Sequence, residues 1–283
     1  MKSWFLYPAA IAGSLLLLAS LVVAVQGGEE RLAWIGAALA NLPLPVFVAL
    51  LLRIRVARTS ENLPLVLLVS AVGVAIAAWE SFVEQNAGWI PTGVAVAGGL
   101  LLLGYVFWYS RFQRVPNARL AVGNKLPDFE LTNLQGDVVR SADYLGKPAV
   151  LIFYRGRWCP VCTGQVMEIA ARQEELEKLG VRLGLVSPQP AEYSRKLARE
   201  TGASSSFLVD SDNAAARALD IVEQGGVPIG RAGGYRPETV MPTVIVTNRN
   251  GTILFSDQAS NYRVRPEPDI YISILKRTGA VTS

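Results

Sequence analysis

The chain contains two cysteines, and their spacing could support thiol redox chemistry. Cys159 and Cys162 are separated by two residues, which suits a reversible disulfide. They follow a β-branched and aromatic run, residues 149–154, and they precede a helical pattern, so we expect them in the first turn of a helix after a buried strand. The start of a helix favours negative charge, and the thiolate is the reactive form of cysteine. The sequence therefore predicts a redox-active Cys159–Cys162 disulfide.

Other uses of the cysteine pair are less compatible with the composition. A zinc site needs about four ligands, whereas the chain offers two cysteines and no histidine. The lack of histidine also excludes Cys–His and Ser–His catalysis. We therefore expect neither a metal nor another cofactor. Two inert cysteines packed in the core remain the alternative, although the Trp158 before the pair and the Pro160 inside it favour the redox interpretation.

Three residues before the cysteines are candidates for supporting them. Arg155 and Arg157 would place positive charge beside a thiolate, and this favours the ionised form. The alternative for both arginines is a solvated surface charge. Trp158 is predicted to shield one side of the site.

The first part of the chain has the composition of a membrane region. The sequence is 51% hydrophobic, and its apolar residues are concentrated before Arg111. Residues 1–112 are predicted to form a transmembrane region of about four helices, followed by a linker, residues 113–122. Because this region has no Cys or His, we expect an anchor or a partner-binding bundle rather than an electron carrier. The four apolar stretches, each close to the ~20 residues that a membrane-spanning helix needs, run approximately over residues 4–25, 32–52, 63–82 and 89–109.

The distribution of basic residues predicts the orientation of these helices. Arginine and lysine gather before the first stretch and after the second and fourth, whereas the two other loops carry a single Arg31. By the positive-inside rule, both termini and the redox domain face the cytoplasm of a multi-pass inner-membrane protein. In that compartment a disulfide is transient and catalytic. The net charge of +4 gives no reason to expect a nucleic-acid partner.

Residues 123–283 alternate strand and helix patterns. An Asn250-Gly251 pair between two of the strand patterns indicates a hairpin. Such an alternation predicts an α/β domain with a mixed central sheet flanked by helices. Strands are expected at residues 129–132, 138–139, 149–154, 181–187, 206–209, 243–247 and 252–255, and helices at residues 162–179, 191–203, 213–219 and 267–276.

Two segments of this domain resemble a known family. Residues 123–132 read Gly-Asn-Lys-Leu-Pro-Asp-Phe-Glu-Leu-Thr, and residues 153–163 contain the cysteines after a Phe-Tyr-Arg-Gly-Arg-Trp run. Both are similar to the alkyl hydroperoxide reductase/thiol-specific antioxidant branch, the peroxiredoxin-like or redoxin branch, of the thioredoxin superfamily. The resemblance covers about residues 123–275. It implies a thioredoxin-like fold and a thiol-dependent oxidoreductase.

The resemblance includes the peroxiredoxin pattern Pro-x-x-x-Thr-x-x-Cys, in which the cysteine attacks peroxide. In this chain Cys162 takes the attacking position, Cys159 replaces the threonine and Arg155 replaces the proline. The peroxide-orienting arginine of the family would fall at Pro242. Two later arginines could replace it, Arg263 and Arg265.

The same segment also resembles thioredoxin. Trp158 to Cys162 matches Trp-Cys-x-x-Cys, and Met241-Pro242-Thr243 is similar to the cis-proline segment before a core strand. In that fold the cis-proline loop lies beside the cysteines and helps to hold the partner chain. A trans Pro242 at the start of a strand is the alternative.

Three functions follow from these patterns. The preferred one is a membrane-anchored thiol–disulfide oxidoreductase in which Cys159, the more exposed thiol, attacks a protein disulfide and Cys162 resolves it. The second is a thiol peroxidase that reduces hydrogen peroxide or organic hydroperoxides through Cys162. In both cases the expected partners are the membrane bilayer and a thiol reductant. The reductant is either a thioredoxin-like protein or a low-molecular-weight thiol. The third is a redox sensor or partner-binding module with little turnover, in which the Gly225–Gly234 loop with Arg231 and Arg236 could bind a partner.

Overall fold

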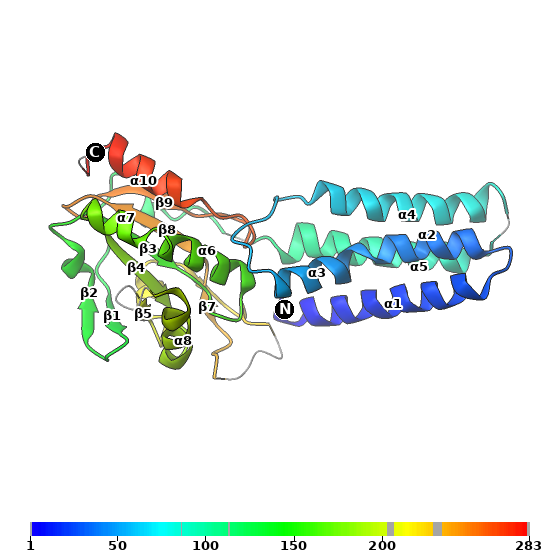
Figure 1. Ribbon diagram of the computed structural model, residues 1–283, viewed down its shortest axis with the longest axis horizontal. Helices are drawn as coiled ribbons and strands as arrows, with labels where there is room; N and C mark the ends of the chain where they lie inside the picture. The colour runs from blue at the N-terminus through cyan, green and yellow to red at the C-terminus, as the bar shows by residue number, and fades with distance from the viewer. Residues whose placement is uncertain (1, 86, 113, 203–206, 229–233, 282–283) are drawn as a thin grey trace. The chain divides into compact units, whose positions relative to one another are not determined.

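The computed structural model describes residues 2–85, 87–112, 114–202, 207–228 and 234–281 (Figure 1). The chain divides into two compact units. One contains residues 1–54 and 59–111, and the other contains residues 55–58 and 112–283. The first unit is helical and the second is an α/β domain.

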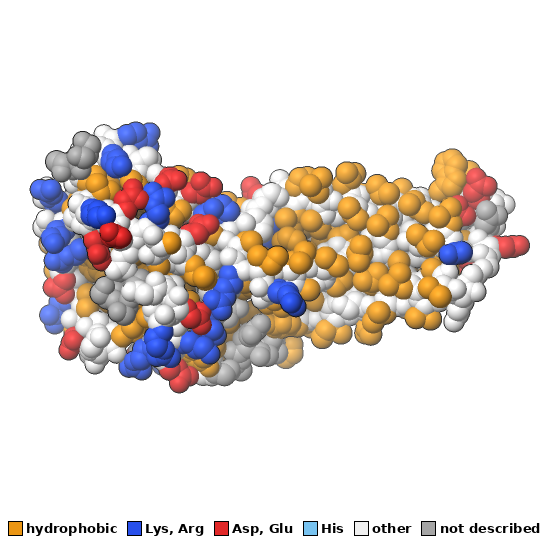
Figure 2. Space-filling model, in the orientation of Figure 1, with side chains coloured by type: hydrophobic (Ala, Val, Ile, Leu, Met, Phe, Trp, Pro, Cys, Tyr) orange, Lys and Arg blue, Asp and Glu red, His pale blue; other side chains and the backbone are white. Residues whose placement is uncertain are grey.

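Four helical segments of the first unit are long and apolar enough to cross a membrane. On the face shown in Figure 2, hydrophobic side chains cover this unit, whereas Lys, Arg, Asp and Glu side chains gather on the α/β unit. Because helices that are apolar all round need an apolar environment, they indicate membrane association. The segments are Lys2–Gln26, Arg31–Arg53, Pro64–Phe82 and Trp89–Tyr109.

These segments contain five α-helices. The second segment is divided at Leu42, immediately before Pro43, whose ring removes a backbone donor from the helix. The last segment ends in a π-helical turn, η2 (Gly104–Tyr109). The helices are α1 (Leu6–Gln26), α2 (Arg31–Asn41), α3 (Pro43–Arg53), α4 (Pro64–Phe82) and α5 (Trp89–Leu103), preceded by the short η1 (Lys2–Trp4).

Helices α2 and α4 approach each other through two glycines. A Cβ atom added at Gly73 would lie 2.3 Å from the backbone nitrogen of Ala40 and 2.6 Å from the carbonyl oxygen of Gly36. Small residues at a helix interface allow this approach and the van der Waals contact that stabilises helices in lipid.

We expect a Gly73→Leu variant to destabilise the helical unit by about 1–3 kcal/mol, because the added side chain has no space between α2 and α4. Unfolding of the full-length protein by denaturing detergent measures the effect. Gly93→Leu is the matched control, since a Cβ at Gly93 meets nothing within 4 Å. Equal loss of stability in the two variants would contradict the predicted contact.

The α/β unit contains a seven-stranded mixed sheet in the order β2-β1-β5-β4-β3-β8-β9 (Figure 1). Strand β3 pairs in parallel with β4 and antiparallel with β8. The strands of this sheet are β1 (Glu130–Asn133), β2 (Val138–Arg140), β3 (Ala149–Phe153), β4 (Arg182–Ser187), β5 (Phe207–Val209), β8 (Thr243–Thr247) and β9 (Ile253–Asp257), and a separate pair consists of β6 (Val222–Glu223) and β7 (Thr239–Val240).

Helices flank this sheet, so the predicted fold class is confirmed. Every residue of β3 and of β8 is buried, as expected for the apolar run Ala149–Phe153 and for residues 244–246 of β8. Gly251 has a φ of 71° in the turn between β8 and β9, a conformation that glycine adopts without steric cost. The remaining elements are η3 (Ala118–Leu120), η4 (Ser141–Tyr144), α6 (Pro160–Ala170), α7 (Gln173–Lys178), α8 (Ala191–Thr201), α9 (Ala214–Ala218) and α10 (Pro268–Arg277).

The structure differs from the sequence prediction in the helix that follows the cysteines. The single helix expected over residues 162–179 is two helices, α6 and α7. Arg172, at the break, adopts φ −101° and ψ 8°, and its side chain pairs with Glu175 at 2.6 Å and Asp269 at 2.9 Å. The pairing with Asp269, on α10, is a tertiary interaction that helical periodicity does not reveal.

The glycine-rich segment before β8 also differs from its prediction. The sequence indicates a loop over residues 223–237, whereas Glu223 belongs to strand β6, which pairs with β7 beyond the other end of that segment. Arg231 lies outside the described residues, as does Ser206, which was expected to start β5.

Candidate active site

The two cysteines lie at the start of α6, immediately after the buried strand β3. Cys159 is the N-cap residue, with φ −94° and ψ 108°, and Cys162 is in the first turn. Pro160 fits the first helical position because its missing N–H would have no helical partner there. Cys159 is 1% exposed and Cys162 is 0% exposed. Both thiols are therefore buried in this structure, and the difference in exposure between them is only 1%.

That turn requires glycine at position 156. Gly156 has a φ of 142°, and an added Cβ would lie 3.0 Å from Cδ1 and Nε1 of Trp158. The indole ring thus packs closely across the turn, and its other contact is the guanidinium of Arg155, 4.7 Å from the ring centroid. Trp158 covers the turn and the neighbouring arginine.

Arg155 is a buried cation beside the cysteine pair. Its guanidinium forms an ion pair with Glu223 at 3.0 Å and donates a hydrogen bond to the carbonyl of Gly226. Only 5% of the residue is exposed, and the rings of Tyr262 and Phe112 lie 5.7 and 5.9 Å from the guanidinium carbon. These contacts fix a positive charge in a site of low polarity, where it acts strongly on a nearby thiol.

The two thiols have opposite pKa shifts. Burial disfavours the thiolate at both positions. For Cys162, a hydrogen bond from the Cys159 thiol, the charges of Arg265 and Arg155, and a hydrogen bond from the Arg155 backbone N–H outweigh burial and lower the pKa to about 6. The pKa of Cys159 is raised by burial and by the adjacent Cys162. Near neutral pH the site therefore holds a Cys162 thiolate and a Cys159 thiol.

Arg265 comes to the site from the segment between β9 and α10. It is 3% exposed, and its Nη1 donates to the carbonyls of Asn261 and Val264. Its Nε and Nη2 are buried and have no hydrogen-bond partner among the described residues. Unsatisfied buried donors are costly, so this edge of the guanidinium is suited to an anionic or strongly polar ligand. Arg263, the other arginine that the sequence suggested as a peroxide-orienting residue, lies two residues before Arg265 and is fully buried.

The other two sequence candidates have different surroundings. Arg157 pairs with Glu200 at 2.8 Å, and it is not among the charges that lower the pKa of Cys162. Pro242 is buried at the end of β8 that is paired with the cysteine end of β3, and its carbonyl accepts a hydrogen bond from Arg114 at 3.3 Å. No described peptide bond is cis, so the bond before Pro242 is trans, the form that X-Pro bonds ordinarily favour. The cis-proline implied by the resemblance to thioredoxin is absent here.

Two contributors to the site were not singled out from the sequence. Glu223 holds Arg155, but it lies in a short strand that was interpreted as loop. The Tyr154 hydroxyl accepts a hydrogen bond from Gln189 at 3.0 Å, and burial raises the pKa of this tyrosine. Tyr154 was counted only as part of the buried run. The sequence signal that could have identified Tyr154 was its hydroxyl group at the end of an apolar strand.

The same domain matches a known protein family. Residues 122–256 match the AhpC/TSA family. These residues form an AhpC/TSA family domain. The chain is also 31% identical over 102 residues to "Peroxiredoxin Bcp" of Bacillus subtilis, a match that covers 36% of this chain and 65% of that protein. The predicted peroxiredoxin-like identity of the domain is thereby confirmed.

Relatives of a second kind match the AhpC/TSA domain. "Thiol-disulfide oxidoreductase ResA" of Geobacillus kaustophilus is 28% identical over 123 residues, which cover 43% of this chain and 69% of that protein. The relatives thus include both peroxiredoxins and thiol–disulfide oxidoreductases. The Bcp-named relatives are matched over 64% to 66% of their own length.

Among solved structures, the peroxidoxin BcpB of Mycobacterium tuberculosis is similar to this chain. The two are 21% identical with a TM-score of 0.46, and the match covers 56% of this chain and 97% of the other.

The lowered pKa of Cys162 leads to a prediction on its reactivity. The rate at which iodoacetamide alkylates Cys162 should rise with pH up to about 6 and level off near 7, because the thiolate is the reacting form. Mass spectrometry of quenched samples measures this rate for each cysteine. Cys159 should stay unmodified over the same range because its pKa is raised. Preferential alkylation of Cys159 would contradict the assignment.

Proposed function

We propose that the protein is a membrane-anchored thiol peroxidase in which Cys162 attacks a hydroperoxide and Cys159 resolves the product. The proposal is supported by the burial of both thiols together with Arg155 and Arg265, and by the two guanidinium nitrogens of Arg265 that lack a hydrogen-bond partner among the described residues. The pKa shifts, lowered at Cys162 and raised at Cys159, favour Cys162 as the attacking thiol. A disulfide reductase of the thioredoxin type needs the reverse assignment, with the first cysteine as nucleophile. The peroxiredoxin relatives support the same choice.

The reaction can be written with its atoms and protons balanced. The Cys162 thiolate attacks the terminal, hydrogen-bearing oxygen of ROOH; the S–O bond of the sulfenic acid forms, the O–O bond breaks, and RO⁻ leaves. Cys159, which is protonated and hydrogen-bonded to Cys162, can supply the proton that converts RO⁻ to ROH. The resulting Cys159 thiolate then attacks the sulfenic sulfur, which closes the disulfide and releases hydroxide. Two electrons from a thiol reductant return the pair to its starting state.

Arg265 and Arg155 have separate roles in this proposal. The buried Nε and Nη2 of Arg265 lack partners, so they can donate hydrogen bonds to the peroxide and to the oxygen on which charge develops. Arg155 has its ion pair with Glu223 and acts instead through its charge and its backbone N–H on Cys162. Arg265 is a catalytic residue in this scheme, and Arg155 is a positioning residue.

The burial of both thiols supports a small oxidant. Cys159 is 1% exposed and Cys162 is 0% exposed. The disulfide of a folded protein substrate therefore cannot reach their sulfurs unless the turn before α6 opens. A hydroperoxide is small enough to need only local motion. The proposal has two further parts. The α/β domain faces the cytoplasm, and a thioredoxin-like protein or a low-molecular-weight thiol supplies the electrons.

The second candidate is a thiol–disulfide oxidoreductase. The Trp-Cys-Pro-Val-Cys segment and the similarity to ResA proteins favour it. In this case Cys162 would still be the more reactive thiol in the closed form, and opening of the turn would have to expose Cys159.

A comparison of hydroperoxide reduction with disulfide reduction tests the proposal. The full-length protein in detergent micelles is supplied with dithiothreitol and either cumene hydroperoxide or insulin as the oxidant. We expect a kcat/KM for the hydroperoxide at least about 100-fold above that for insulin disulfides, since only the small oxidant reaches the closed site. Preferred reduction of insulin would support the second candidate. Negligible turnover of both would instead support the sensor or binding-module hypothesis.

A further inference from the structure

A second cleft of the α/β unit lies away from the cysteines. Its volume is about 480 Å³, within the range of small-molecule sites. It opens beside the amino-terminal ends of β3 and β4, where Ala149 pairs with Arg182, whereas the cysteines follow the carboxyl end of β3. The length of β3 separates the two places by about 15 Å, so the cleft is not part of the redox site.

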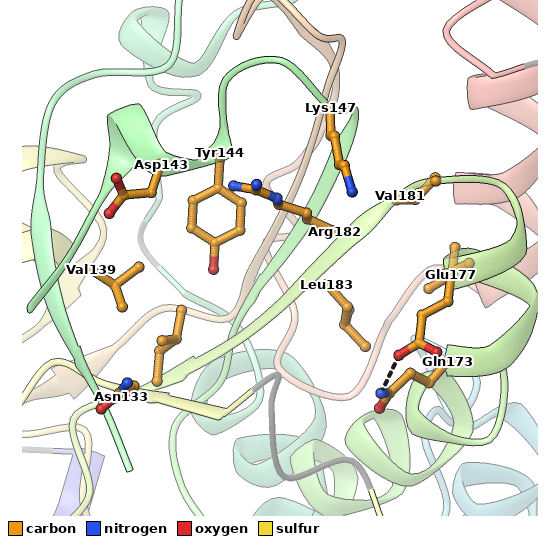
Figure 3. A pocket seen from close by; sticks show the side chains of 13 residues that line it. Asn133, Val139, Asp143, Tyr144, Lys147, Gln173, Glu177, Val181, Arg182 and Leu183 are labelled. Atoms are coloured by element: carbon orange, nitrogen blue, oxygen red, sulfur yellow. Dashed lines mark hydrogen bonds between the residues drawn. The ribbon is translucent and has the colours of Figure 1, made fainter. Parts of the chain in front are cut away.

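The cations in this cleft are available, whereas its acids are already bound. Lys147 and Arg182 line it, and neither forms an ion pair with any carboxylate in the described part of the chain. By contrast, Glu177 accepts a hydrogen bond from Gln173 (Figure 3), and Asp143 accepts one from the backbone N–H of Arg140. The cleft therefore presents two cations without an ion-pair partner among the described residues, Lys147 and Arg182, beside two carboxylates that keep their charge.

Tyr144 supplies a hydroxyl to the lining of the cleft. The residue is 7% exposed, and its hydroxyl has no hydrogen bond to any described residue. Figure 3 shows its ring beside the Arg182 guanidinium, with the hydroxyl directed into the cleft. Burial raises the pKa of Tyr144, so the hydroxyl remains a donor at neutral pH. Glycine at position 184 leaves room for it, since a Cβ there would lie 2.7 Å from the hydroxyl oxygen.

The lining also has an apolar part. Leu176, Leu183 and Leu208 contribute aliphatic side chains from α7, β4 and β5. A ligand that filled the cleft would thus need an apolar body and an acceptor group with negative charge, which Arg182, Lys147 and the Tyr144 hydroxyl could bind together.

We propose that this cleft is a binding site for a small organic carboxylate with an apolar body, separate from the redox centre. The carboxylate pairs with Arg182 and Lys147 and accepts a hydrogen bond from Tyr144, while the apolar body lies against the leucines. The proposal does not depend on which reaction the cysteines perform.

Photolabelling of the full-length protein in detergent tests this site with 4-azidobenzoate as the probe. Mass spectrometry identifies the labelled peptides, and unlabelled benzoate is the competitor. We expect saturable labelling of the peptides around Lys147 and Arg182. Arg182→Gln should raise the half-saturating concentration about tenfold or more, Tyr144→Phe should raise it less, and Arg182→Lys should restore part of the binding. The matched control Arg277→Gln removes an exposed arginine elsewhere and should leave binding unchanged.

The uncharged analogue 4-azidobenzamide decides whether the site is selective for anions. Weak labelling by the amide, with wild-type thiol reactivity retained in Arg182→Gln, supports the proposal. Equal labelling by acid and amide would overturn it, because the cleft would then be only an apolar cavity. Labelling that does not saturate, or that maps near the cysteines or the helical unit, would also overturn it.

Discussion

Replacing Cys162 by serine is expected to slow the oxidation of the protein by hydroperoxides by roughly 10³-fold or more, since the attacking thiolate is lost. Replacing Cys159 by serine should leave the first oxidation step within about tenfold of wild type, because Arg265 and Arg155 still stabilise the Cys162 thiolate. The difference between the variants follows from the opposite pKa shifts of the two thiols. Stopped-flow tryptophan fluorescence, with Trp158 beside the site, measures the rates.

The products distinguish the roles further. Wild type should finish with a Cys159–Cys162 disulfide, whereas Cys159→Ser should stop at a sulfenic acid and then oxidise further with excess peroxide. Thermal unfolding measured without peroxide checks that both variants are folded. If Cys159→Ser lost the fast phase and Cys162→Ser kept it, Cys159 would be the attacking thiol, and the assigned roles of the two cysteines would be wrong. Slow oxidation of wild type and of both variants would support the oxidoreductase hypothesis instead.

Replacing Arg265 by glutamine is expected to lower the second-order rate constant with hydrogen peroxide by about 10²-fold. Two buried donors that have no hydrogen-bond partner among the described residues are lost, and removal of one such donor from an active site typically has an effect of this size. The positive charge near Cys162 is lost as well, so the pKa of Cys162 should rise above 6 and the pH profile should shift with it. A structural defect alone would lower the rate without this shift.

Two further variants define the role of Arg265. Arg265→Lys should keep the pKa of Cys162 low but recover only part of the rate, because lysine restores the charge without the planar pair of donors. Arg157→Gln is the matched control, and since Arg157 pairs with Glu200, its rate should stay within about threefold of wild type. Equal losses in Arg157→Gln and Arg265→Gln would contradict the assignment.

The fold was largely predictable from local patterns. The apolar run that ends at Phe153 formed a central buried strand, and Asn250-Gly251 formed the turn between β8 and β9. The break at Arg172 was not predictable, because one of the contacts that hold it is to Asp269, 97 residues later in the chain. Patterns within one element therefore indicated the elements themselves but not the tertiary pairs that end them.

The site was predictable in place but not in its electrostatics. The spacing of Cys159 and Cys162 located the site at the start of a helix, and the structure has both cysteines there. Which of them ionises depends on Arg265, which is distant in sequence, and on the close contact of the two thiols. Because Arg155 and Arg157 are both close to the cysteines in sequence, both were candidates for stabilising the thiolate. The ion pair between Arg157 and Glu200 is visible only in the structure.

Trapping of the sulfenic acid tests the central claim most directly. Reduced Cys159→Ser protein is mixed with one equivalent of hydrogen peroxide in the presence of dimedone, and the adduct is located by mass spectrometry. We expect a single dimedone adduct on Cys162 that forms within the fast oxidation phase. An unmodified Cys162 under these conditions, with a dimedone adduct on Cys159 in the matched Cys162→Ser protein, would contradict it.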